Sequence, residues 1–302
     1  MTITSTAPPS TPYQRAYVRG LSSSFSAAAL SSHDNSLKPI DMDLAHHQHE
    51  RYVEVIKQLV PQVATVPASD KLADCCFIED TCVVAGNIAV ITRPGHENRR
   101  GEVIQVKDCL SANPNLTLHQ MPEHCCLDGG DVLFTGTDFF VGLSKRTNQA
   151  GADFLSKIFY EQNKIAPVHT INLQNSASAA TLHLKCVVTA LTDTILVVSD
   201  DEPGRFVQGE IERQVQEHYQ GATSGYSFVA VPDQVSANIL RFPDGKGGAL
   251  GIVVQKGFSR SAEIISKVAK EESPNCQVFE LDMSEFILAD GALTCCSLLL
   301  TE

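Results

Sequence analysis

Short apolar runs of strand-forming residues alternate with amphipathic helical stretches along most of this chain, and that alternation restricts the fold more than any other feature. Gly- and Pro-containing segments such as Arg93-Pro94-Gly95 separate the stretches. The chain contains no long linker, low-complexity middle or tight repeat. Such alternation predicts an α/β or α+β protein, after a Ser-, Thr- and Pro-rich tail over residues 1–13 that we expect to be disordered.

The periodicity of the apolar residues places the elements more closely. The expected helices are Asp41–Val60, Arg99–Leu110, Ala150–Tyr160, Phe206–His218 and Ser261–Glu271. The expected strands are Gln14–Val18, Cys76–Val84, Ile88–Thr92, Val132–Thr135, Phe139–Gly142, Thr194–Val198, Ser227–Val231, Asn238–Phe242, Leu250–Gln255 and Leu293–Leu300. A dinucleotide-binding fold is not indicated, because no Gly-x-Gly-x-x-Gly opens a helix and the Asp-Gly-Gly-Asp at 128–131 would repel a phosphate.

Composition excludes several classes of protein. A hydrophobic fraction of 43% over 302 residues can bury a large core, as one big domain or two. The net charge of −12 is spread along the chain, and without a basic stripe we expect no nucleic-acid partner. The first residues lack the pattern of a secretory signal, and no apolar stretch is long enough to span a membrane. We therefore expect a cytoplasmic protein.

The cysteines point to thiol chemistry or core packing rather than to disulfides. Ten cysteines in a chain of this kind favour free thiols. They include three adjacent pairs but no Cys-x-x-Cys pair, so a structural zinc site is not indicated. Most cysteines in folded proteins behave as small buried hydrophobic residues, and that is the default interpretation of each one here.

Two adjacent acids, Glu79 and Asp80, lie within a strand-like run. Paired carboxylates inside a sheet are unfavourable unless a positive group compensates them. A guanidinium compensates well, because its planar fork matches carboxylate geometry. The residues leave two alternatives open: the acids bind a guanidinium ligand, or they form an internal salt bridge with Arg93, Arg99 or Arg100.

Three residues from distant segments could form a nucleophilic triad. Asp128 lies in a glycine-rich turn, where it could orient a catalytic group or only cap the turn, and His183 could be an acid–base group or a core residue. Cys295 and Cys296 fall on an expected strand, where alternation would turn them to opposite faces and allow at most one to face a central site. Arg146, just past a strand end, is well placed to hold a carboxylate. A cysteine, a histidine and an orienting acid are the components of a thiol hydrolase.

Six segments of the sequence, which contain most of the residues described above, together resemble the dimethylarginine dimethylaminohydrolase family in order and spacing. The resemblance covers about residues 16–300 and is densest over 127–151. The Asp of LDGGD makes the chain more similar to eukaryotic than to bacterial members. The resemblance implies a five-bladed α/β propeller, built of ββαβ-type repeats around a polar central pore, with residues 14–302 as one catalytic domain. It rests on the segments FIEDTCVV, ITRPGHENRR, LDGGDVLFTGTDFFVGLSKRTNQAG, LHLKC, VPDQVSANILRF and DGALTCCSLLL.

The resemblance implies hydrolysis of Nω-methylated arginines to citrulline and dimethylamine or methylamine. Cys295 is then the nucleophile, His183 the general acid and base, and Asp128 the acid that orients it. Glu79 and Asp80, with Asp74 nearby, would bind the guanidinium and α-amino end, and two arginines would hold the carboxylate. The segment around Leu30 matches the family least. The full set of substrate-binding residues that the resemblance implies is Leu30, Asp74, Phe77, Glu79, Asp80, Arg99, Arg146, Ala289 and Asp290.

No metal or organic cofactor is implied, although zinc could inhibit by bridging Cys295 and His183. The partner we expect is the small-molecule substrate, for a monomer or a homodimer. Arginine deiminase and amidinotransferase chemistry on the same fold are alternatives, and a non-catalytic propeller scaffold is an alternative of a different class. The stretches 163–180 and 215–225 diverge from the family and are assigned no function.

Overall fold

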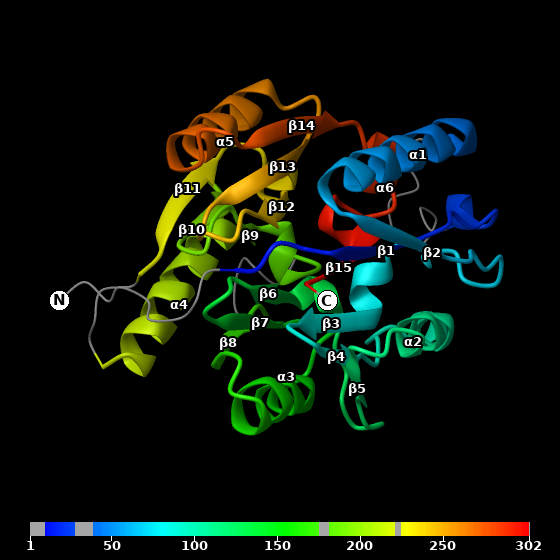
Figure 1. Ribbon diagram of the computed structural model, residues 1–302, viewed down its shortest axis with the longest axis horizontal. Helices are drawn as coiled ribbons and strands as arrows, with labels where there is room; N and C mark the ends of the chain where they lie inside the picture. Colours follow the sequence, from blue (N-terminus) through cyan, green and yellow to red (C-terminus); the bar gives the residue numbers. More distant parts are fainter. Residues whose placement is uncertain (1–9, 28–38, 175–180, 221–224, 302) are drawn as a thin grey trace.

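The computed structural model describes residues 10–27, 39–174, 181–220 and 225–301. Within them the strands form five sheets of three strands each, arranged as blades around a centre (Figure 1). In every blade the inner strand pairs antiparallel with the middle strand, and the middle strand pairs parallel with the outer one. This arrangement confirms the five-bladed α/β propeller.

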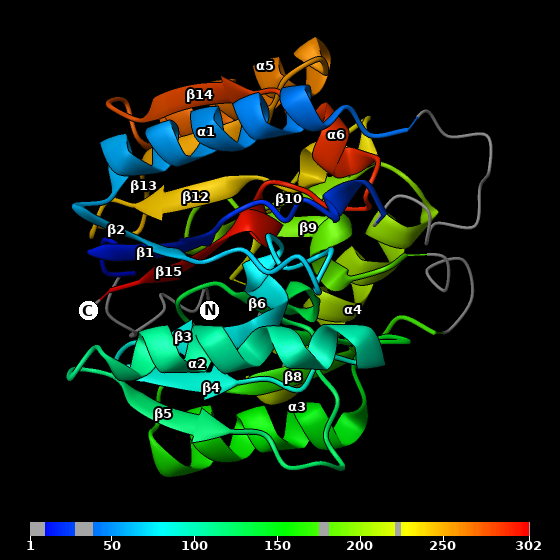
Figure 2. The same cartoon turned by 90° about the vertical axis from the view of Figure 1, so that its right-hand side faces the viewer.

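The blades follow one another along the chain, except that the last strand completes the first blade. In order of inner, middle and outer strand, the blades are β15 (Ser297–Leu300), β1 (Arg15–Arg19) and β2 (Gln62–Val66); β3 (Cys82–Ala85), β4 (Ile88–Ile91) and β5 (Thr117–Gln120); β6 (Val132–Phe134), β7 (Phe139–Leu143) and β8 (Val168–Asn172); β9 (Val188–Ala190), β10 (Ile195–Ser199) and β11 (Ser227–Val231); and β12 (Leu240–Pro243), β13 (Ala249–Gln255) and β14 (Gln277–Leu281). Strands β1 and β15, from opposite ends of the chain, therefore lie side by side (Figure 2).

A helical segment connects each middle strand to its outer strand, because two parallel strands need a long crossover. These segments lie on the outside of the ring of blades (Figure 1). The Asp41 side chain opens the first of them by accepting the backbone N–H groups of Asp43 and Leu44. The segments are α1 (Met42–Leu59), the 3₁₀ helix Glu97–Glu102 with α2 (Val103–Ser111), α3 (Gln149–Leu155) continued as a π-helix over Ser156–Gln162, α4 (Glu202–His218) and α5 (Ser259–Glu272), while the short α6 (Ser284–Ile287) follows β14.

A short 3₁₀ turn precedes the inner strand of every blade, at intervals of about 50 residues along the chain. Neighbouring turns contact one another, so that together they form a ring of turns at the start of the inner strands. Polar side chains concentrate in this ring. Its members are η2 (Ile78–Thr81), η4 (Gly129–Asp131), η7 (Leu184–Cys186), η8 (Gln234–Ala237) and η9 (Thr294–Cys296).

The ring of turns corrects two of the expected strands. Residues 78–81 and 294–296 are 3₁₀ turns, so the strands begin at Cys82 and Ser297 and not at Cys76 and Leu293. Both runs are apolar enough to suggest strands because the turns themselves are buried at the centre of the molecule. Periodicity cannot separate a buried turn from a buried strand over so few residues.

Expected helices match observed helical segments in all five places, and every expected strand overlaps an observed one. Six elements were not predicted from the sequence: β9, α6 and four of the outer strands, β2, β5, β8 and β14. Outer strands such as Gln277–Leu281 carry polar residues and are partly exposed, and their apolar pattern is therefore weak. Apolar packing lies at the interfaces between blades, as where Val83 contacts the cluster of Val132 and Val141.

The sequence also predicts a disordered N-terminal tail and no stretch that could span a membrane. Residues 1–9 of the expected tail lie outside the described residues, whereas Ser10 hydrogen-bonds to Asp193 through both its backbone N–H and its hydroxyl. The division into a tail and one domain remains a prediction. Among the described residues, no helix is both long enough and apolar enough to span a bilayer.

Candidate active site

The ring of turns brings together the candidate catalytic and binding residues predicted from the sequence. Asp80 belongs to η2, Asp128 immediately precedes η4, His183 immediately precedes η7, and Cys295 lies in η9. These four residues come from four different blades. The 3₁₀ turns bring them close together because neighbouring turns contact one another around the ring.

His183 and Asp128 form a buried acid–base pair, with 3.1 Å between His183 Nε2 and Asp128 Oδ2. The other Asp128 oxygen accepts the backbone N–H of Gly95 at 2.8 Å. Asp128 makes no hydrogen bond that caps its own turn, so the turn-capping alternative is wrong. Burial alone would lower the pKa of His183, but the charge of Asp80, the hydrogen bond that His183 donates to Asp128 and the charge of Asp131 outweigh it and raise this pKa to about 9. The imidazole therefore carries a proton at neutral pH.

Asp80 is a buried carboxylate held ionised by its neighbours. It accepts Arg99 Nη1 at 2.6 Å and the Gly130 backbone N–H at 2.8 Å. Burial alone would raise the pKa of Asp80, but His183 and Arg99 outweigh it and lower this pKa to about 2. A side chain at Gly130 would place its Cβ 2.8 Å from His183 Nδ1 and 3.0 Å from Asp80 Oδ1. Glycine at this position therefore allows the two residues to approach.

The two arginines expected to hold a carboxylate differ in their surroundings. The Glu102 carboxylate accepts hydrogen bonds from Arg99 Nε at 3.0 Å and from Arg99 Nη2 at 2.8 Å. Arg99 Nη1 donates to Asp80, so all three guanidinium nitrogens of Arg99 have protein acceptors. The internal salt bridge considered from the sequence is thus present, between Asp80 and Arg99. Arg146 is half-buried and, within the described part of the chain, its guanidinium makes no ion pair with a carboxylate.

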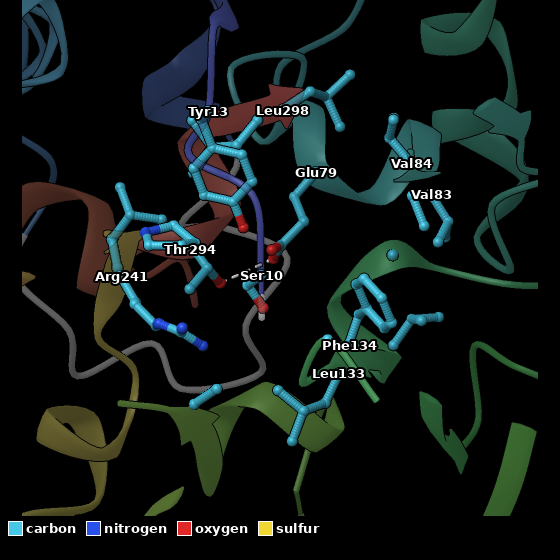
Figure 3. Close-up of a pocket in the computed structure, with 18 of the residues that line it drawn as sticks. Ser10, Tyr13, Glu79, Val83, Val84, Leu133, Phe134, Arg241, Thr294 and Leu298 are labelled. Carbon is cyan, nitrogen blue, oxygen red and sulfur yellow. Dashed lines mark hydrogen bonds between the residues drawn. The ribbon is translucent and has the colours of Figure 1, made fainter. Parts of the chain in front are cut away.

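Glu79 has a different environment from its neighbour Asp80. Its two oxygens accept Lys185 Nζ at 2.5 Å and Thr294 Oγ1 at 2.8 Å. Consecutive residues of a 3₁₀ turn are about 120° apart around the axis, which separates the two side chains. Glu79 borders a cavity of about 430 Å³ that the inner strands surround, and Asp80 is not among the lining residues (Figure 3).

Cys295 and Cys296 lie in the same turn but in different environments. Cys296 is fully buried among apolar residues, whereas Cys295 is partly exposed. The expected separation by strand alternation is wrong, since η9 is a turn, and it is the turn that gives the two thiols different surroundings. Burial and the charges of Glu79 and Asp80 raise the pKa of the Cys295 thiol well above its usual range. In this structure the Cys295 side chain is therefore a neutral thiol at neutral pH.

The other expected binding residues lie around this site, apart from Leu30, which is outside the described residues. Asp290 is exposed, has a left-handed φ of 57°, and lies close enough to Asp74 and Arg146 for their charges to act on its pKa. Phe77 is buried and packs against Gly291, where an added Cβ would lie 2.1 Å from the ring. Ala289 is half-buried.

Five polar residues that the sequence analysis did not select also belong to the ring or support it. Their signal was available: each turn combines polar residues with the start of an apolar inner strand, and that combination recurs once in every blade. Asp131 accepts Ser144 Oγ and Thr147 Oγ1, each at 2.6 Å, and burial raises its pKa to about 6. The five residues are Glu102, Asp131, Lys185, Asn238 and Thr294.

Asp80, Asp128 and His183 have ligand atoms within 4.8 Å of one another, a spacing that could hold a metal ion. The same atoms are already engaged, since Asp80 binds Arg99 and Asp128 binds His183. The Arg99 guanidinium would also repel a divalent cation at this point. We therefore assign no metal to these three residues.

Comparison with known proteins identifies a matching family model, relatives in sequence and solved structures with the same fold. The family model described as RNA-editing substrate-binding complex 5 protein matches residues 16–272. The N(G),N(G)-dimethylarginine dimethylaminohydrolase of Streptomyces coelicolor is 30% identical over 269 residues, which cover 87% of this chain and 88% of that protein.

Two solved structures share the fold. A Cys-to-Ser variant of the dimethylarginine dimethylaminohydrolase of Pseudomonas aeruginosa, complexed with citrulline, superposes with a TM-score of 0.76 at 23% identity over 96% of this chain and all of that one. The substrate-bound N-terminal domain of the cyanobacterial arginine dihydrolase ArgZ gives a TM-score of 0.71 at 18% identity, over 95% of this chain and 98% of that one.

Proposed function

The chain belongs to the sequence family of the RNA-editing substrate-binding complex 5 protein and to the dimethylarginine dimethylaminohydrolase family, and from the second membership we propose that it hydrolyses Nω-methylated arginines to citrulline. Members of that second family are hydrolases that act on the C–N bonds of amidines, and this chain is such an enzyme. The proposed substrates are asymmetric dimethylarginine and monomethylarginine, and the proposed location is the cytoplasm.

One observation carries the proposal: burial and the nearby negative charges of Glu79 and Asp80 suppress the ionisation of the Cys295 thiol. A cationic guanidinium bound at Asp80 would offset those charges and favour the thiolate. An imidazolium at His183 would favour the thiolate as well, if it approaches the sulfur. Substrate binding thus activates the nucleophile, while a neutral ligand would not.

We propose the following reaction. The Cys295 thiol loses its proton to solvent as the cationic substrate binds, and the thiolate then attacks the guanidinium carbon. His183 gives its proton to the departing nitrogen, and the C–N bond breaks to release dimethylamine. A cationic thiouronium remains on Cys295. Water then loses a proton to His183 and adds to that carbon, the C–S bond breaks, and citrulline leaves as a further proton passes to solvent.

The remaining residues hold the substrate. Arg146, whose guanidinium has no carboxylate partner among the described residues, is the proposed anchor for the substrate carboxylate. Asp74 and Asp290 lie near it and are the proposed partners of the α-amino group. Because every nitrogen of Arg99 is engaged, we assign Arg99 to holding Asp80 in place rather than to contacting the carboxylate.

Product analysis tests the proposal. Purified protein should release citrulline and dimethylamine from asymmetric dimethylarginine without added metal, and should release much less citrulline from arginine. Preferred turnover of arginine would instead support the deiminase alternative. Transfer of the amidino group to an added amine, with ornithine as the product, would support the amidinotransferase alternative.

The scaffold alternative has one observation in its favour, since the matched family model is named for a protein of a substrate-binding complex. Against it stands the intact combination of a partly exposed Cys295, a protonated His183 and an engaged Asp128. A folded protein that releases no citrulline from any methylated arginine would favour the scaffold.

A further inference from the structure

Asn238, the residue that follows η8, is buried at the centre of the ring of turns. Its side-chain carbonyl accepts the Thr294 backbone N–H at 2.9 Å. Its side-chain amide donates to Thr294 Oγ1 at 3.0 Å and to the Lys185 carbonyl oxygen at 2.9 Å. One side chain thus ties the turn of the nucleophile to the turn that follows the general base.

These contacts belong to a closed circuit of hydrogen bonds. Thr294 Oγ1 donates onward to Glu79 (Figure 3). The other Glu79 oxygen accepts Lys185 Nζ. Lys185 returns to Asn238 through its backbone carbonyl. The circuit therefore passes through Asn238, Thr294, Glu79 and Lys185, which lie in or beside four of the five turns.

Each of three circuit members is a near neighbour in sequence of a catalytic or substrate-binding residue. Thr294 precedes Cys295, Glu79 precedes Asp80, and Lys185 is two residues after His183. Fixing a short turn fixes the direction of the side chains on it. A displacement of about 1 Å between reacting groups can cost roughly 100-fold in rate.

We propose that Asn238 is a positioning residue that sets the distance between the Cys295 sulfur and the His183 imidazole. This inference rests on the proposed function, because it assigns Asn238 a part in that reaction. Asn238 touches neither substrate nor reacting atoms, and it acts only through Thr294 and Lys185. An amide suits the position because it accepts from one turn while donating to two groups, which neither a carboxylate nor an aliphatic side chain can do.

Two substitutions separate the possible roles. Asn238→Ala removes all three hydrogen bonds, whereas Asn238→Asp keeps the shape but loses the two donated bonds and adds a charge near Glu79. The matched control is Asn113→Ala, because Asn113 is also buried but lies after α2, where its side chain accepts the Asn115 N–H. Asn238→Ala should lower kcat on asymmetric dimethylarginine by roughly 100-fold while KM changes less than about threefold. Asn113→Ala should lose a similar amount of thermal stability with kcat unchanged.

A second readout does not depend on turnover. Alkylation of Cys295 by iodoacetamide can be followed by mass spectrometry in a Cys296→Ser background, at pH 8, with and without His183→Ala. In the parent protein His183→Ala should slow alkylation, because the imidazolium favours the thiolate. In Asn238→Ala the same substitution should have little further effect, so that the two changes are strongly non-additive.

The outcomes are distinguishable. If the parent protein releases no citrulline, the proposed function fails, yet coupling between Asn238 and His183 in the alkylation assay still supports positioning. Additive effects of Asn238→Ala and His183→Ala on alkylation would overturn the inference. So would a fall in kcat no larger than that of an equally destabilised Asn113→Ala, or a rise in KM with kcat unchanged.

Discussion

The two sides of the ring of turns carry buried charges of the same kinds but balance them differently. On the side of the inner strands, Glu79 pairs with Lys185, and Asp193 pairs with Arg241 at 2.6 Å, each acid with one base. On the side of Asp80 and His183, acids outnumber bases. The buried acids there are Asp80, Glu102, Asp128 and Asp131, and the buried bases are Arg99 and His183.

This difference shows which side is built for a ligand. Charges that are already paired need nothing further, so the cavity among the inner strands is accounted for by structure alone. A surplus of buried carboxylates is unfavourable until a cation joins them. The sequence could not reveal this contrast, because Glu79 and Asp80 are adjacent in the chain and yet belong to opposite sides.

The largest expected effect separates the two thiols of η9. Cys295→Ser should abolish citrulline formation, because a hydroxyl of far higher pKa cannot replace the thiolate. Cys296→Ser should keep substantial activity and lose some stability, since Cys296 is fully buried among apolar residues. Steady-state kinetics and thermal unfolding of both variants provide the comparison. An active Cys295→Ser protein would contradict the assignment of the nucleophile.

Acids on the two sides of the ring should respond differently to neutralisation. Asp80→Asn should reduce kcat/KM by an amount equivalent to roughly 2–5 kcal/mol, because it removes the partner of the guanidinium. Asp193→Asn removes an equally buried partner of Arg241 on the other side and should lower the melting temperature with little change in kcat/KM. If Asp80→Asn mainly unfolds the protein while Asp193→Asn impairs turnover, the contrast between the two sides is wrong.

The surplus of acids around His183 also predicts that kcat depends on pH. Since the pKa of His183 is raised to about 9, the general acid should lose its proton and kcat should fall as pH rises through that value. Asp128→Asn removes one cause of the increase, so the alkaline limb should move down toward the ordinary value of 6.5. The stability that protonated His183 contributes should be complete below pH 6.5 and lost as pH rises through about 9. A limb that does not move in Asp128→Asn would contradict the pairing.

A smaller effect should distinguish Arg146 from the fully engaged Arg99. Arg146→Lys keeps the charge but loses the bidentate fork, so KM should rise severalfold while kcat changes little. Decarboxylated substrate should be much poorer than the intact one for the parent protein and only slightly poorer for Arg146→Ala. Equal losses in both proteins would show that Arg146 does not hold the carboxylate.

Much of the architecture could be predicted from the sequence, with different success for inner and outer parts. Middle strands such as Ile88–Ile91 are buried along their whole length and stand out as apolar runs. Outer strands such as Gln62–Val66 are half-exposed and carry little pattern, so four of them were missed. The 3₁₀ turns at Glu79 and Cys295 were mistaken for the first parts of strands, because each turn leads directly into an apolar inner strand.

The residues of the candidate site were easier to select than to arrange. Cys295, His183, Asp128 and Asp80 stood out as polar or nucleophilic residues in apolar surroundings, and the structure brings them into neighbouring turns. Asn238 was not selected, because the recurrence of polar residues before each inner strand becomes apparent only once the five blades are known. Nor could spacing show that Arg99 is held by Glu102, three residues away, and by Asp80, nineteen residues away.

The most direct test of the central claim is to trap the intermediate. Protein mixed with asymmetric dimethylarginine, quenched in acid and digested should yield a mass increase on the peptide that carries Cys295 and Cys296. That increase should equal the substrate less dimethylamine, should persist in Cys296→Ser and should be absent from Cys295→Ser. An adduct that requires Cys296, or citrulline release that continues in Cys295→Ser, would contradict the mechanism.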